Sequence, residues 1–345
     1  MNKPTVSVLL PNLNHLAFLQ RRTDSILNQT LKDWELIVVD SYSTDGSWEF
    51  FQDLAKRDNR VKISQAPKGL YQSWNRCLKQ VSGEFVYIAT SDDSMQFNAL
   101  EKMVEALREH PECGICDSQL EMVDESDRPI EGTNDSLFFY RYLGSLISKK
   151  HIRRRPHDGI VYLSSNSVYT SMTQILFRRS LLQKVGPFKT KWGSKCDYEW
   201  GIRASFSTDT IYLPEKLSQW RRHVDQATAK KPSTPAHQGR LEMAMAALDD
   251  IEDFQFLDQS IHSRREELLS FLKFEAVKDK VRFSGTDNSK VLALFELWLG
   301  SGQRSYQLWK EQFGKLIGKR VTTSLNEINR FKDRYDLNTL IEVID

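Results

Sequence analysis

The sequence predicts an α/β fold in which a mostly parallel sheet is flanked by helices. Short apolar segments alternate with amphipathic segments of helical periodicity along the first part of the chain. Most of the apolar segments show no alternation of apolar and polar residues, which is typical of parallel strands covered on both faces. After about residue 233, Gly and β-branched runs become sparse, which predicts an α-helical C-terminal extension.

The predicted strands and helices alternate in chain order. Strands are expected over residues 5–10, 35–40, 61–64, 85–89 and 113–123. The spacing of apolar residues predicts intervening helices over 18–27, 47–57, 69–81 and 99–110. This order implies βαβ units, whose right-handed crossovers bring the carboxyl ends of the parallel strands to one edge of the sheet. Ligands of open α/β folds bind at that edge.

The second half of the chain is less regular. Residues 126–166 contain the basic run Lys149–Arg155, for which a phosphate-binding loop and a solvated face are both open. Helices are predicted over 239–257, 263–283, 290–299 and 305–317. We therefore expect an α/β domain over residues 1–232 and an α-helical domain over 233–345. The basic, amphipathic segment 309–320 suits either an anionic membrane surface or packing against the first domain or another subunit.

The overall composition limits the class of protein. Lys and Arg number 48 against 46 Asp and Glu, and this net charge of +2 gives no electrostatic case for nucleic-acid binding. No apolar stretch approaches the ~20 residues that span a bilayer. The four cysteines suggest a reducing compartment, and Cys113 with Cys116 lacks the spacing of a zinc site. We expect a cytoplasmic protein, with peripheral contact at the inner face of the membrane as an alternative.

Carboxylates follow two of the predicted strands. Asp40 ends the second strand, and Asp92 with Asp93 follows the fourth. Such residues could cap the next helix, or hold a phosphate-bound Mg²⁺ or Mn²⁺ at the shared edge of the sheet. Neither the G-x-G-x-x-G fingerprint after the first strand nor a G-x-x-x-x-G-K-[ST] loop is present, so dinucleotide-dependent hydride transfer and P-loop chemistry are poorly supported.

Two later segments carry further candidate residues. Asp197 lies at the start of a predicted helix, where it is either a cap or a general base at the mouth of a pocket. Arg221, Arg222 and His223 follow a predicted strand and suit a diphosphate, and His223 could ligate a metal. A surface basic cluster is the alternative for these three residues.

Several motifs, in this order and spacing, closely resemble the family 2 glycosyltransferases of the GT-A (Rossmann-like) fold. They are Val6–Asn14, Ser25–Thr30, Trp34–Asp40 with Ser43–Gly46, Lys68–Asn75, Gly83–Ile88, Ser91–Asp93, Phe177–Ser180, Lys184–Phe188, Asp197 and Trp220–His223. The resemblance extends to about residue 228 and does not cover the final helical part.

The resemblance implies an inverting transferase that uses a nucleotide-diphosphate sugar, UDP- or GDP-linked, and a divalent metal, Mn²⁺ or Mg²⁺. By position, Asp197 would be the catalytic base, and Asp93 the direct metal ligand together with His223. The donor-binding positions would be Pro11, Asn12, Asn14, Asp40, Lys68, Asn75, Asp92 and Arg222. The acceptor would be a hydroxyl of a glycan, a lipid-linked oligosaccharide or another molecule, used in surface polysaccharide or glycolipid assembly.

This sequence departs from the family pattern at two positions. Thr90 stands where the commoner D-x-D-D form has its first acid, which leaves fewer carboxylates for the metal. Cys196 stands where a Glu usually precedes the base, which removes an acid that could contact the acceptor.

Two other functions compete with glycosyl transfer. A sugar-phosphate nucleotidyltransferase would call for a Gly-rich basic loop after the first strand, and Pro11–Asn14 is not such a loop. A non-catalytic nucleotide-sugar-binding protein is compatible with Thr90 and Cys196, but Asp197 argues against it. The C-terminal helices would serve acceptor, membrane-surface or homo-oligomer contacts.

Overall fold

The computed structural model describes residues 3–131, 137–163, 167–223, 236–250 and 335–344, together with residues 269, 329, 332 and 333. The chain forms two compact units. The first consists of Met1–Tyr162, Ser167–Ala229 and Leu340–Asp345, and the second of Leu163–Asn166 and Lys230–Thr339. Apart from residue 269, the helices predicted over 263–283, 290–299 and 305–317 lie outside the described residues, as does the segment 309–320.

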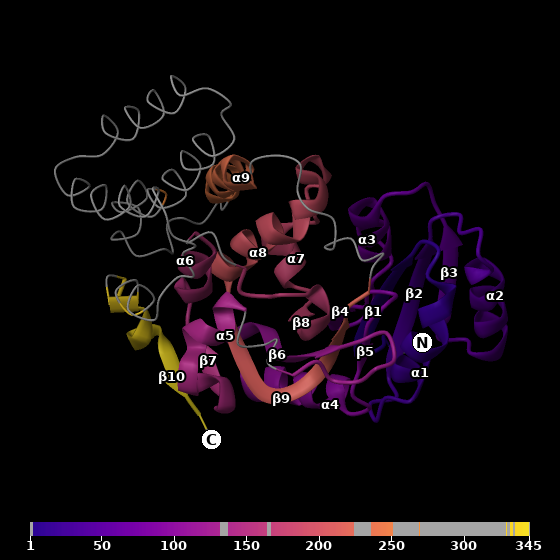
Figure 1. The fold of residues 1–345 in the computed structure, drawn as a ribbon, viewed down its shortest axis with the longest axis horizontal. Helices are drawn as coiled ribbons and strands as arrows, with labels where there is room; N and C mark the ends of the chain where they lie inside the picture. Colours follow the sequence, from indigo (N-terminus) through magenta and orange to yellow (C-terminus); the bar gives the residue numbers. More distant parts are fainter. Residues whose placement is uncertain are drawn as a thin grey trace. The chain divides into compact units, whose positions relative to one another are not determined.

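The first unit is built on one large sheet flanked by helices, which confirms the predicted α/β fold. Within the described residues the sheet has ten strands, in the order β10-β7-β9-β6-β8-β4-β1-β2-β3, with β5 paired to β9 (Figure 1). The strands are β1 (Val6–Asn12), β2 (Trp34–Asp40), β3 (Val61–Gln65), β4 (Phe85–Ile88), β5 (Ser94–Met95), β6 (Cys113–Val123), β7 (His151–Arg153), β8 (Ile175–Arg178), β9 (Asp209–Arg221) and β10 (Ile341–Val343).

Strand direction differs between the two sides of the sheet. β1 lies parallel to both β2 and β4, and β2 lies parallel to β3, as the sequence predicts. β8 is antiparallel to both of its neighbours, β4 and β6, and β7 is antiparallel to β9. The sheet is therefore mixed rather than mostly parallel beyond β4. The direction of β8 depends on the irregular segment that precedes it, and no periodicity encodes that path.

The predicted helices of the first half are confirmed, with boundaries shifted by a few residues. The helices are α1 (Leu16–Leu27), α2 (Ser47–Arg57), α3 (Leu70–Leu78), α4 (Ala99–Glu109), α5 (Phe138–Leu143), α6 (His157–Leu163), α7 (Leu181–Val185), α8 (Cys196–Ser207) and α9 (Ala236–Asp250). A 3₁₀ segment over Thr190–Lys195 leads directly into α8. In the described parts of the chain, no helix combines the length and apolar character needed to cross a membrane.

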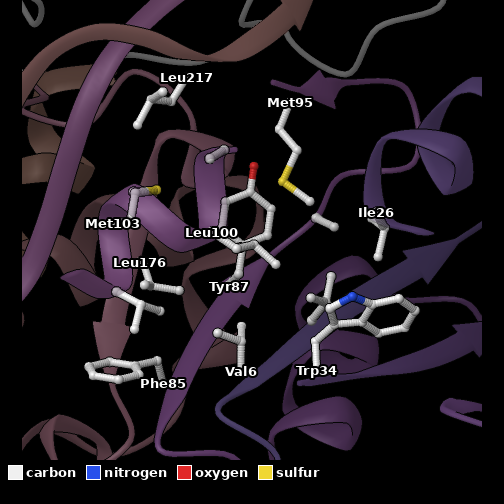
Figure 2. Packing of buried hydrophobic residues seen from close by; sticks show 14 of the residues in the cluster. Val6, Ile26, Trp34, Phe85, Tyr87, Met95, Leu100, Met103, Leu176 and Leu217 are labelled. Carbon is white, nitrogen blue, oxygen red and sulfur yellow. The ribbon is translucent and has the colours of Figure 1, made fainter. Parts of the chain in front are cut away.

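The central strands are buried on both faces, as their continuous apolar sequences predict. Every residue of β1 and β2 is buried, and the side chains of Val6, Trp34, Phe85 and Tyr87 form part of one core (Figure 2). Helices α1 and α4 contribute further residues to this core, such as Ile26 and Leu100 (Figure 2). Burying apolar surface on both faces fixes the strands against each other, so their polar ends have defined positions.

The register of β1 on β2 places two polar residues side by side. Asn12 pairs with Asp40, and these are the last residues of the two strands. β4 pairs with β1 on its other side and leads through residues 89–93 into β5. The predicted convergence of Asp40 and the Asp92–Asp93 segment on one edge therefore follows from the parallel β2-β1-β4 order.

The last described strand of the chain was not predicted. β10 pairs antiparallel with β7 at the edge of the sheet, and Arg154 donates to the Glu342 carboxylate at 2.6 Å. Arg154 also donates to Asp209 at 3.0 Å, which ties this edge to the start of β9. The predicted boundary between residues 232 and 233 stays a prediction.

The interpretation of Lys149–Arg155 as a ligand-binding or solvated basic run is wrong for Arg153. Its side chain is fully buried and donates at 2.8 Å to both Asp117 of β6 and Asp158 of α6. Asp117 accepts a second hydrogen bond from Gln174 at 2.7 Å, and the His157 ring contacts Asp158 at 2.7 Å. The charges are thus paired and hydrogen-bonded, which is the condition for tolerating them inside a protein.

Replacing Arg153 with Met should destabilise the fold strongly, because it leaves two buried carboxylates without their cation. Removing one partner of a buried pair costs about 3–5 kcal/mol in the free energy of unfolding. Arg108→Met is the matched control, since Arg108 pairs with Glu84 at the surface, where both side chains are about half exposed. Urea denaturation measures both variants, and equal losses of stability would contradict the structural role of the buried pairs.

Candidate functional site

The first part of the site is the edge formed by β1, β2 and the turn after β2. The buried Asp40 carboxylate accepts from Asn12 Nδ2 at 2.9 Å and from the Ser43 hydroxyl at 2.6 Å. Its other oxygen accepts from the Ser43 backbone N–H at 2.9 Å and from Gln65 at 3.4 Å. Asp40 therefore fixes the turn that follows it, and as the last residue of β2 it lies at the carboxyl edge of the sheet.

Asn12 contributes an acceptor to the same edge. The residue is only 3% exposed, and its amide nitrogen donates to Asp40 and to Ser43. Its oxygen, Oδ1, is buried and has no hydrogen-bond partner in the described structure. A buried carbonyl oxygen without a donor costs free energy, so this atom is suited to accept from a ligand N–H or a water molecule.

Asn14 and Pro11 shape the backbone around Asn12. Asn14 adopts a left-handed conformation, with φ of 55°, which Asn tolerates better than most residues. Its N–H donates to the Ser43 hydroxyl at 2.9 Å, and its Oδ1 accepts from the Thr44 N–H at 2.8 Å. Pro11 is buried inside β1. Asn14 thus fastens the loop after β1 to the loop after β2, and the residue is exposed.

The second part of the site surrounds Asp93, which is 3% exposed. One carboxylate oxygen accepts from the Arg221 backbone N–H at 2.9 Å, and the other accepts from the Thr90 hydroxyl. Burial and the neighbouring Asp92 carboxylate raise the pKa of Asp93 to about 7. One oxygen of Asp93 therefore fastens the β4–β5 connection to the end of β9, and the other accepts a hydrogen bond within that connection.

Asp92 and His223 lie against each other. Asp92 Oδ2 and His223 Nε2 are 3.0 Å apart, and the His223 ring packs on Phe18 of α1 with the ring centroids 5.0 Å apart. His15, which the sequence analysis missed, joins the same group: its Nδ1 lies 2.5 Å from the Ser91 hydroxyl, and its ring lies 6.1 Å from that of His223. Its position directly after Asn14, between the first predicted strand and the first predicted helix, was the available signal.

The two consecutive arginines have different environments. Arg221 is 2% exposed, and its guanidinium donates to the backbone carbonyls of Asp92, Asp124 and Glu125 at 2.8, 2.9 and 3.2 Å. Arg222 is exposed, and its guanidinium lies over the Trp220 ring. Arg221 therefore organises the loops beneath the site, whereas Arg222 is accessible to a diphosphate.

Asp197 lies in the first turn of α8, half-buried, and accepts from the Tyr198 N–H at 2.8 Å. Burial raises the pKa of its carboxyl above the usual value, while hydrogen bonds from the Tyr198 N–H and the Tyr71 hydroxyl act in the opposite direction. The buried Cys196 thiol contacts the carbonyl oxygens of Lys189 and Gly193 at 3.2 and 2.9 Å. Cys196 thus holds the preceding turn closed.

The remaining two predicted residues belong to the segment around α3. Lys68 is exposed and lies just before the helix. The Asn75 amide is engaged at both ends by the Phe188 backbone: Nδ2 donates to the carbonyl at 2.8 Å, and Oδ1 accepts from the N–H at 3.0 Å. These bonds give Asn75 a structural role, and its predicted contact with a donor stays a prediction.

The residues that could hold a metal are few. Among the residues that the structure describes, no group of three or more His, Cys, Asp or Glu side chains has the arrangement of a metal site. In this region Asp92 Oδ2 and His223 Nε2 lie 3.0 Å apart. Two neighbouring ligands of an octahedral ion with bonds of about 2.1 Å stand roughly 3.0 Å apart, so this pair fits two coordination positions.

Comparison with known proteins identifies the family. Residues 7–186, just over half of the chain, match Glycosyl transferase family 2. An uncharacterized glycosyltransferase of Nostoc sp. is 26% identical over 328 residues, which cover 90% of this chain and 96% of that protein. The GalNAc(5)-diNAcBac-PP-undecaprenol beta-1,3-glucosyltransferase of Campylobacter jejuni is 36% identical over 112 residues, covering 31% of this chain and 35% of that protein.

Solved structures share the fold. S. aureus TarS (residues 1–349) in complex with UDP-GlcNAc matches with a TM-score of 0.61 at 16% identity, covering 97% of this chain and 92% of that one. The mannosyltransferase PcManGT of Pyrobaculum calidifontis, in complex with GDP-Man and Mn²⁺, matches with a TM-score of 0.56 at 16% identity, covering 97% and 88%. These likenesses confirm the expected GT-A fold. The chain belongs to glycosyl transferase family 2, and the protein is a glycosyltransferase.

Proposed function

We propose that the protein transfers a sugar from a UDP- or GDP-linked donor to a hydroxyl acceptor with inversion at the anomeric carbon. The observation that carries this proposal is the meeting of the β1–β2 edge with the Asp92–His223 pair, at the carboxyl ends of adjacent parallel strands. The complexes of TarS with UDP-GlcNAc and of PcManGT with GDP-Man support a nucleotide-sugar donor. The undecaprenol-linked substrate in the name of the Campylobacter relative supports a role in surface polysaccharide or glycolipid assembly.

The base and ribose of the donor would lie along the β1–β2 edge. Asn12 Oδ1 is the acceptor there that lacks a protein donor, so it suits an N–H of a uracil or guanine base. Pro11, Asn14 and Asp40 would shape this end of the site, and Lys68 would approach from the segment before α3. The exposed Arg222 would pair with the diphosphate, for which a planar guanidinium is well suited.

A divalent ion would be held by Asp92 and His223, with the diphosphate and water completing its coordination. The predicted choice of Asp93 as the direct ligand is less favourable, because its two oxygens already accept hydrogen bonds from Thr90 and Arg221. When bound, the ion would neutralise charge on the departing diphosphate. The metal complex of PcManGT supports the use of Mn²⁺.

Asp197 would act as the general base. Its carboxylate takes the proton of the acceptor hydroxyl while that oxygen forms a bond to the anomeric carbon. The bond from this carbon to the diphosphate oxygen breaks on the opposite face, so the configuration inverts. The C-terminal domain, proposed to begin at residue 233, would supply acceptor, oligomer or membrane-surface contacts.

Replacing Asp197 with Asn should lower kcat by about 10²–10⁴, the usual contribution of a general base. Nucleoside-diphosphate release from UDP-GlcNAc and GDP-mannose measures turnover, with nucleotide binding as the control for folding. In the native enzyme, activity should fall as the pH decreases through the raised pKa of Asp197, above the ordinary Asp value of about 3.9. Binding of a donor without turnover by the native protein would favour the non-catalytic alternative.

Removing either proposed metal ligand should abolish the effect of Mn²⁺ on nucleotide affinity. Asp92→Asn and His223→Gln each remove one of the two protein ligands, so calorimetry with UDP or GDP should show the same affinity with and without MnCl₂. Asp93→Asn should keep a gain in affinity with Mn²⁺ but lower the melting temperature, because it weakens the contact with Arg221. The reverse pattern would restore Asp93 as the direct ligand.

A further inference from the structure

His15 connects the two parts of the candidate site. It lies between β1 and α1, directly after Asn14. Its Nδ1 lies 2.5 Å from the hydroxyl of Ser91, which directly precedes Asp92 in the β4–β5 connection. The β1–β2 edge is the proposed place of the nucleobase, and Asp92 belongs to the proposed metal pair. His15 therefore lies at the junction between the nucleoside end and the metal end of the site.

The His15 ring has a defined position. It packs edge-on against Phe18 and His223, with the ring centroids 6.0 and 6.1 Å apart and interplanar angles of 85° and 88°. The next residue, Leu16, donates its backbone N–H to Asp45 Oδ2 at 2.8 Å, and the Phe18 N–H donates to the His15 carbonyl at 2.9 Å. Because ring and backbone are both held, a contact between His15 and a ligand costs little ordering entropy.

The two ring nitrogens of His15 have different environments. Ser91 is 5% exposed, and its hydroxyl lies against Nδ1. Nε2 has no hydrogen-bond partner among the described residues, and the side chain is only half-buried. A neutral imidazole carries its proton on one nitrogen, and the hydrogen bond of the other nitrogen decides which one. A hydroxyl that donates to Nδ1 therefore leaves the proton on Nε2, where a ligand can accept it.

The ligand group expected at this junction is the diphosphate of the donor. A diphosphate links the nucleoside to the sugar, so it must pass between the β1–β2 edge and the Asp92–His223 pair. Its oxygens carry negative charge beside the carboxylates of Asp92 and Asp93, so neutral or cationic hydrogen-bond donors are needed to stabilise it. The exposed Arg222 is one such donor in the proposed function, and His15 would be a second.

We propose that His15 is a donor-binding residue whose Nε2–H group hydrogen-bonds to the diphosphate, and that Ser91 is a positioning residue that donates to Nδ1. This hydrogen bond strengthens as negative charge develops on the departing diphosphate, so it favours the transition state over the bound donor. No covalent bond of His15 forms or breaks in the reaction. The inference rests on the proposed transfer from a nucleotide sugar.

The test compares His15→Asn with His15→Gln by calorimetry of the full-length protein. Asn places a polar group near the position of Nδ1, where it can contact Ser91, and has none at the position of Nε2, whereas the longer Gln places its amide near Nε2. His15→Asn should bind UDP or GDP, whichever the native protein binds, about tenfold more weakly, because a hydrogen bond to a charged group is lost. His15→Gln should recover most of this affinity. The affinity for the free nucleoside, measured by competition, should be unchanged in both variants.

Two further variants separate positioning from general effects. Ser91→Ala should weaken binding of the diphosphate less than His15→Asn does, and it should have no further effect in the His15→Asn background, because the group that it positions is then absent. His110→Asn is the matched control. His110 lies at the end of α4, where its Nδ1 is 3.6 Å from Glu112, and its replacement should leave nucleotide binding unchanged.

Equal affinity of His15→Asn and the native protein for the diphosphate would overturn the inference and leave the proposed transfer standing. An equal loss of affinity for the free nucleoside would show that His15 only holds the loop. At saturating nucleotide the affinity for Mn²⁺ should be unchanged in His15→Asn, and a tenfold weaker affinity would make His15 a metal ligand instead. If the native protein binds neither UDP nor GDP, with or without MnCl₂, the proposed function itself is wrong.

Discussion

The arrangement of the site depends on a reciprocal contact between two segments that are far apart in the sequence. The Asp93 carboxylate accepts from the backbone N–H of Arg221, and the Arg221 guanidinium donates to the backbone carbonyl of Asp92. Each segment thus satisfies buried polar groups of the other, for which an unpaired group would cost about 1–3 kcal/mol. Because this contact ends β9 at the β4–β5 connection, it also brings His223 against Asp92. The C-terminal end of the long strand β9 and the acidic pair are therefore held together.

Much of the fold could be predicted because it follows from local patterns. The parallel strands β1, β2 and β4 are continuous apolar runs, and their polar ends marked the shared edge correctly. The direction of β8, the pairing of β10 and the burial of Arg153 could not be predicted, since each depends on contacts between distant segments. The run of basic residues around Arg153 predicts a solvated side chain. Its burial depends on Asp117 and Asp158, which only the fold brings next to it.

In the candidate site, too, the features that follow from local sequence could be predicted, and those that depend on distant contacts could not. The sequence located the acids at the edge, but it could not show which of two adjacent aspartates faces inward. Asp93 directly precedes the short strand β5 and is buried against the end of β9. The Asp92 carboxylate instead contacts His223. His15 was missed because the contacts that bring it into the site, with Ser91 and His223, come from distant parts of the chain. One departure from the family pattern also acquires a physical meaning: the Thr90 hydroxyl supplies a donor to the buried Asp93 carboxylate, where another acid would add a like charge.

The pairing of β10 with β7 has a topological consequence. Because the chain returns to the first sheet at residues 341–343, the second unit is an insertion with both of its ends tied to the first. A segment anchored at two points loses chain entropy compared with one that hangs from a single linker, as in any closed loop. Ending the chain at Ala229 would also remove β10 and leave the outer edge of β7 unpaired. An open strand edge is a template for pairing with other chains. Residues 341–343 therefore belong to the same sheet as β1, near the other end of the chain.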